Sequence, residues 1–157
     1  MLDRQRGRPL RPTHVAPTIL DAARRLLERT SDLVGIGVVD IEEFSQRVSA
    51  GGRFFVDRLF TAAEWELCGG RHERLASRLA GKQAVAMMLG LADVDVHARE
   101  IELRAGDHGA PYVTLRGAPC DVAGQAGLHR LLVSISREGG CASAIAVGVR
   151  TPGPAAG

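Results

Sequence analysis

The feature that most restricts the fold of this chain is a long amphipathic run at residues 73–91. Its apolar side chains recur at the three- and four-residue spacing of one helix face, and the run stops near Gly90. The run also carries Lys82, the only lysine in the sequence. Because burial can make a compact ammonium lose its proton, which a guanidinium does not do, we single out Lys82 as a candidate catalytic residue.

The sequence before this helix divides into several segments. Four arginines, together with Pro9, Pro12 and the nearby Pro17, predict that residues 1–16 form a flexible basic arm, and the helical apolar spacing of residues 17–32 predicts an additional amphipathic helix. Residues 33–41 are apolar and predict a buried strand, followed by a short helix to residue 48, a turn at 50–52 and a core-packing segment at 53–60 that holds three phenylalanines.

Thr61 and Glu64 have the spacing of a capping box, which predicts a helix over residues 62–68 that ends at Gly69. Beyond the long helix the chain is mostly β. Two hairpins are expected, the first at 100–104 and 112–115 and the second at 131–136 and 142–149, with a helix at 118–129 between them. The prediction is an α+β domain at residues 33–150, with one long helix packed on a small, largely antiparallel sheet and a tail at 151–157.

Composition narrows the class of protein. A net charge of +2 gives no overall field that favours nucleic acid or a membrane surface, and no apolar run reaches the ~18 residues that a membrane span needs. Three scattered cysteines fit a reduced, cytoplasmic protein. The sequence contains no P-loop, no zinc-ligand spacing and no Ser/His/Asp order. His97 is the best placed of the dispersed histidines, although a surface role is the simpler interpretation.

Three glutamates offer further carboxylates. Glu64 has the simpler interpretation of a helix cap, and Glu102 that of the solvated face of a strand, because it alternates with Ile101 and Leu103. Glu100 stands in the same strand.

Six short motifs occur in an order that is familiar. They are Gly35-Ile36-Gly37 followed by an acid, Phe60-Thr61 with Glu64, Arg78-x-Ala80-x-Lys82-x-Ala84, Glu100-Ile101-Glu102, Gly109-x-Pro111 and Val133-Ser134-Ile135-Ser136. Over residues 33–149 the chain resembles the holo-acyl-carrier-protein synthase family, the short phosphopantetheinyl transferases.

The resemblance implies an enzyme that moves the phosphopantetheine arm of coenzyme A onto a serine of an acyl carrier protein in fatty acid or polyketide biosynthesis. It implies Mg²⁺ on the pyrophosphate, and homotrimers with active sites between subunits. It further implies that Lys82 meets a phosphate and that Arg78, Ser134 and Arg137 help to bind coenzyme A. The metal would be held by an aspartate just after the Gly-x-Gly strand, for which Asp40 is the candidate, and by a glutamate in the helix.

The chain departs from the family pattern at three positions. The glutamate of the helix is replaced by Gln83, a neutral amide, and the usual histidine by Arg137, which cannot accept a proton. Family spacing places the aspartate where this chain has Val39, so that Asp40 lies one residue too far along and a regular strand would turn it to the opposite face. A β-bulge near Gly37 would restore its direction. Alternatively, Asp40 matches a later acid and the first ligand is missing.

Three functions remain open. The first is phosphopantetheine transfer with an altered metal site. The second is a repurposed enzyme that acts without metal on a carrier-tethered or coenzyme A-linked intermediate, for example in a cyclisation or isomerisation, with Lys82, Gln83 and Asp40 available for acid–base work. The third is a non-catalytic subunit that binds a carrier protein.

Overall fold

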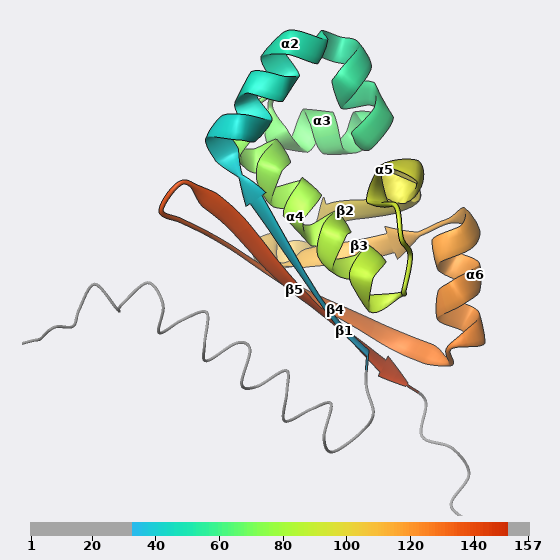
Figure 1. The fold of residues 1–157 in the computed structure, drawn as a ribbon. Coiled ribbons are helices and arrows are strands. Elements are labelled where there is room, and N and C mark those ends of the chain that lie inside the picture. Colours follow the sequence, from blue (N-terminus) through green and yellow to red (C-terminus); the bar gives the residue numbers. More distant parts are fainter. Residues whose placement is uncertain (1–32, 151–157) are drawn as a thin grey trace, which may run out of the picture. The chain divides into compact units, whose positions relative to one another are not determined.

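The computed structural model describes residues 33–150, which form an α+β fold and confirm the predicted class (Figure 1). The expected basic arm, the additional helix and the tail lie outside the described residues. Strands β1 (Leu33–Asp40), β5 (Cys141–Arg150) and β4 (Leu128–Glu138) form an antiparallel sheet in the order β1-β5-β4. A separate antiparallel hairpin contains β2 (Ile101–Ala105) and β3 (Pro111–Leu115).

The long helix α4 (His72–Met88) crosses one face of the three-stranded sheet (Figure 1). Close packing on β1 depends on two glycines, since a Cβ atom on Gly35 would collide with the carbonyl oxygen of Ala84 and one on Gly37 with that of Ala80. The backbone approach that the sequence predicted for these glycines is therefore present. On another side of α4, Gly81 makes room for Leu103 of β2.

Helix α2 (Ile41–Leu59) differs from the prediction. The expected short helix, turn and core segment are one helical stretch that is broken at Gly52, where φ is 58° and ψ is −151°. A glycine adopts this conformation without a steric penalty, so the chain kinks there and continues as helix. The prediction that all three phenylalanines of this segment pack in the core is only partly right. Phe60 is buried and Phe55 is partly buried, but Phe54 is 79% exposed.

The shorter elements complete the fold. Helix α3 (Ala62–Cys68) has the predicted capping box and ends at Gly69 in the left-handed conformation. Helix α6 (Gly117–Gln125) is shorter than expected, and the short helices α5 (Val94–His97), η2 (Ala98–Glu100) and η3 (Asp107–Gly109) were not predicted. None of the helices in the described part of the chain combines the length and hydropathy required to cross a bilayer.

Candidate functional site

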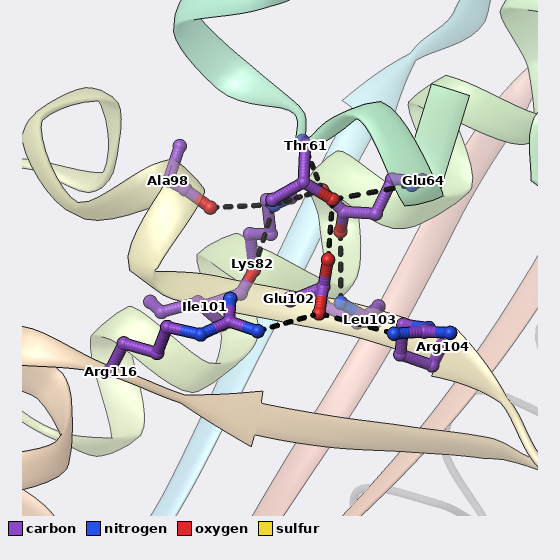
Figure 2. A network of polar contacts seen from close by, with 9 residues as sticks. All are labelled: Thr61, Glu64, Lys82, Ala98, Ile101, Glu102, Leu103, Arg104 and Arg116. Atoms are coloured by element: carbon purple, nitrogen blue, oxygen red, sulfur yellow. Dashed lines mark hydrogen bonds and ion pairs between the residues drawn. The ribbon is translucent and has the colours of Figure 1, made fainter. Parts of the chain in front are cut away.

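Lys82 lies in the interior of the fold, with no exposed surface. Its Nζ atom donates hydrogen bonds to Glu64 Oε2 at 2.8 Å, the carbonyl oxygen of Ala98 at 2.6 Å and that of Ile101 at 2.7 Å (Figure 2). An ammonium group has three protons, so all of its donors are used within the chain. The arrangement ties α4 to α3 and to the segment that leads into β2, and leaves no donor for the predicted contact with a phosphate.

Glu64 confirms its predicted role as a cap and does more. One oxygen accepts from the backbone N–H of Thr61 at 2.9 Å as well as from Lys82, and the other accepts from the N–H of Leu103 at 2.9 Å. The carboxylate is fully buried, and these partners satisfy it. A buried lysine that meets a carboxylate and two carbonyl oxygens is therefore a structural centre that joins three elements (Figure 2).

The prediction that Glu102 faces solvent is wrong, because only 3% of the residue is exposed. Both faces of this part of β2 are covered, so strict alternation of polar and apolar residues does not report solvent exposure here. Glu102 accepts a hydrogen bond from Thr61 Oγ1 at 2.6 Å and forms an ion pair with Arg116, whose Nη2 atom lies 3.3 Å from Oε1 (Figure 2). The Nη1 atom of Arg104 lies 3.6 Å from the same oxygen.

Burial and neighbouring charges shift the pKa values of two groups in this network. Loss of hydration lowers the pKa of Lys82 from its ordinary value and outweighs the opposing attraction of Glu64. The hydrogen bond from Thr61, supported by Arg116, lowers the pKa of Glu102 despite its burial.

Gln83 faces the free edge of β1 instead of a ligand site. Its Oε1 atom accepts a hydrogen bond from the backbone N–H of Val38 at 3.1 Å. One turn further along α4, the Met87 sulfur lies 3.4 Å from the backbone nitrogen of Ile36. Because β1 is an edge strand, these two side chains satisfy N–H groups that no neighbouring strand reaches.

The hypothesis that a bulge turns Asp40 towards α4 is wrong. Pairing between β1 and β5 runs without interruption from Leu33 opposite Gly148 to Asp40 opposite Cys141. Since Gly37 faces α4, alternation places Val39 on the same face and Asp40 on the opposite one. The Asp40 carboxylate accepts from the N–H of Glu43 at 2.8 Å and caps α2.

These positions allow a test of whether the residues fit the Mg²⁺ ion that the resemblance implies. Val39, at the position of the expected aspartate, is apolar and 7% exposed. Asp40 lies on the other face of the sheet, and the Gln83 oxygen is used by β1. Among residues 33–150 no group of three or more His, Cys, Asp or Glu side chains is placed to hold a metal. The donor set therefore does not fit a protein-held Mg²⁺ ion, which prefers carboxylates.

Two residues that were predicted to contact coenzyme A lie at similar levels along the sheet. Val39 and Arg137 both pair with Ala142, so all three stand in one row across the sheet, on the face that α4 covers. In the preceding row, Ile135 lies against Gly81 of α4. The two-residue step from Ile135 to Arg137 along β4 corresponds to about one helical turn, which places Arg137 level with the turn that contains Arg78.

The other site candidates lie elsewhere. Ser134 pairs with Ile145 and, by alternation, faces away from α4. His97 forms a pair with Glu100, with 2.8 Å between Nδ1 and Oε1, in the segment before β2. The strand register thus places Arg137 at the end of the sheet that is level with the helical turn of Arg78, while Ser134 and Asp40 point to the other face. Arg78 lies one turn before Lys82 on the same side of α4.

Sequence reasoning missed the partners of Gln83 and the buried network around Glu102. The available signal for the network was the spacing of Thr61 and Glu64, which already indicated a capped helix, but the long-range partner of the Thr61 hydroxyl depends on the fold.

A long central helix on a small antiparallel sheet is the fold that this chain shares with solved holo-acyl-carrier-protein synthases. The chain belongs to the holo-acyl-carrier-protein synthase family. It is 31% identical over 118 residues to the holo-acyl-carrier-protein synthase of Halothermothrix orenii, covering 73% of this chain and 94% of the relative. Over 117 residues it is 40% identical to that of Beutenbergia cavernae, covering 74% and 97%. No protein-family model matches the chain.

Solved structures agree with this assignment. The Helicobacter pylori holo-acyl-carrier-protein synthase in complex with coenzyme A superposes with a TM-score of 0.66 at 25% identity, covering 74% of this chain and 99% of the other. The Mycobacterium tuberculosis acyl carrier protein synthase gives a TM-score of 0.58 at 29% identity, covering 76% and 97%.

Proposed function

We propose that this protein transfers the 4′-phosphopantetheine arm of coenzyme A to a serine of an acyl carrier protein. The observation that carries the proposal is the match to holo-acyl-carrier-protein synthases over nearly their whole length, together with the same fold. Since the relatives are enzymes of this one activity, the chain is most simply an enzyme of the same class.

Arg78 offers a specific contact for coenzyme A. Its Nε atom is buried and has no hydrogen-bond partner in the described structure. An unpartnered buried donor costs about 1–3 kcal/mol, which a bound anion would recover. Arg137, which the strand register places opposite the same helical turn, adds a second guanidinium, and guanidinium groups bind phosphate oxygens through paired hydrogen bonds. We infer that this end of the domain receives phosphate groups of coenzyme A.

Intact-mass spectrometry tests the transfer directly. The full chain is incubated with coenzyme A and an apo carrier protein, once with Mg²⁺ and once with EDTA, and the carrier should gain the mass of one phosphopantetheine. A carrier variant with Ala in place of the acceptor serine is the matched control. Failure to modify any carrier encoded near this protein would refute the proposal.

The changed residues favour one alternative function. Val39 and Gln83 remove both expected carboxylates, which is the change expected if the fold now acts on a coenzyme A-linked or carrier-tethered intermediate without metal. Binding of coenzyme A without any mass gain on the carrier would support this alternative, or a non-catalytic carrier-binding subunit, and a search for altered acyl products would separate these two.

We also propose a homotrimer with sites between subunits, in the cytoplasm. The face of the three-stranded sheet opposite α4 carries an apolar patch formed by Val34, Ile36, Val38, Leu132, Ile145 and Val147. None of the helices in residues 33–150 lies over this face (Figure 1), and Ile36, Val38 and Leu132 are 38%, 58% and 46% exposed. Seating a second copy there would bury this apolar surface.

Native mass spectrometry of wild type and of Val38→Glu tests the assembly. The variant should dissociate, because a carboxylate in an apolar interface loses its hydration. Phe54→Glu, a change at an exposed residue of α2, is the control and should leave the assembly intact. A monomeric wild-type protein would contradict this proposal.

A further inference from the structure

The row formed by Val39, Ala142 and Arg137 at the end of the three-stranded sheet contains a positive charge and no negative charge. Where the family resemblance leads us to expect an aspartate, Val39 packs into the core, and Gln83 of α4 is neutral and bonded to the edge of β1. Neither position supplies a negative charge to a cation. The nearest acid in the sequence, Asp40, lies on the other face and caps α2.

The same row instead contains a positively charged side chain, that of Arg137. Arg137 stands two strands from Val39, about 10 Å away, on the same face of the sheet. It is exposed and forms no ion pair with any residue of the described chain. The strand register places it opposite the helical turn of Arg78, whose Nε is also without a partner.

An exposed guanidinium without a paired carboxylate favours a multiply charged anion and disfavours a divalent cation beside it. A guanidinium also keeps its charge at every physiological pH and needs no ligands of its own. The loss of both carboxylates and the gain of Arg137 are therefore consistent with one change in how the site neutralises phosphate.

We propose that Arg137 supplies, as a fixed guanidinium, the positive charge that a protein-held Mg²⁺ ion would otherwise bring to the pyrophosphate of coenzyme A. The inference rests on the proposed function, because it takes coenzyme A as the ligand. It concerns ligand binding, so its test does not require transfer to a carrier.

Isothermal titration calorimetry with coenzyme A on the full chain provides the test. Affinity in excess Mg²⁺ should differ from that in EDTA by less than about threefold. Arg137→Gln should weaken binding by about 10- to 100-fold, the value of a lost charge-assisted contact, and Arg137→Lys should restore part of it. Arg58→Gln, at an arginine in the last turn of α2, removes the same charge elsewhere and should have little effect.

A second readout separates ligand contact from a structural role. Because Arg137 is exposed, Arg137→Gln should keep the melting temperature of wild type, while the dependence of coenzyme A affinity on salt concentration becomes shallower.

Three results would overturn the inference: strengthening of coenzyme A binding by Mg²⁺ beyond about threefold, a change below about threefold in Arg137→Gln, or no coenzyme A binding by wild type. The last result would also refute the proposed function. Normal Arg137-dependent binding without any mass gain on a carrier would refute only the proposed function.

Discussion

Replacing Lys82 by methionine should strongly destabilise the domain. The substitution removes the ammonium and leaves the Glu64 carboxylate in a fully buried position, where two backbone N–H groups remain as its partners. The carbonyl oxygens of Ala98 and Ile101 lose their donor as well. Breaking a buried ion pair on one side costs about 3–5 kcal/mol, a large share of the total stability of about 5–15 kcal/mol that a domain has.

Urea unfolding measures the effect. With a dependence of about 1–3 kcal/mol per molar urea, the midpoint should fall by about 2 M. Lys82→Met combined with Glu64→Gln should recover part of the loss, because a neutral amide is less costly to bury than an unpaired carboxylate. Lys82→Arg should not rescue, since a planar guanidinium does not match three acceptors that surround one nitrogen.

The matched control is Arg53→Met, which breaks an exposed ion pair with Asp57 at 2.6 Å. Such a pair, four residues apart on a helix, contributes about 0.3–0.5 kcal/mol. If Lys82→Met costs no more than this control, the internal role of the ammonium is refuted, and Lys82 becomes available again as a catalytic residue.

Three further predictions follow from the structure. The hydrogen bond from Thr61 lowers the pKa of Glu102 from its ordinary value, so its stabilising contribution is present above the unfolded-state pKa and is lost as the pH falls through the lower folded-state pKa; Glu102→Gln should make the acid dependence of unfolding shallower. Burial raises the pKa of Cys68, so a thiol reagent should label exposed Cys120 rapidly and Cys68 only on unfolding. Gly37→Ala should cost about 1–3 kcal/mol or more in thermal unfolding, because its Cβ would collide with a carbonyl oxygen of α4.

The sequence was sufficient for features that depend on neighbours along the chain. The capping box at Thr61 and Glu64, the hairpins and the close approach at Gly35 and Gly37 follow from local chemistry, and the structure confirms them. Helix α2 was predicted too short because the glycines around Gly52 are typical of a turn. In the structure Gly52 bends the helix without ending it.

Features that depend on the packing of distant segments were not accessible in the same way. Alternation indicated a solvated Glu102, but α3 and Arg116 cover the side of β2 to which it points. The engagement of Gln83 with β1 requires knowing that α4 runs along the free edge of that strand. A side chain with two possible partners, a metal or a backbone N–H, cannot be assigned until the geometry is known.

The fold relates the three departures from the family pattern to one another in space. They lie on β1, α4 and β4, far apart in the sequence, yet Val39 and Arg137 share one row of the sheet and Gln83 bonds to the strand that carries Val39. Two carboxylates with a divalent cation present a neutral site to an incoming pyrophosphate, whereas two carboxylates alone would repel it. Replacing both carboxylates by neutral side chains and adding a guanidinium avoids that repulsion without any metal. Loss of one carboxylate alone would weaken a metal site; the combined change is what a site adapted to bind phosphate through arginine would require.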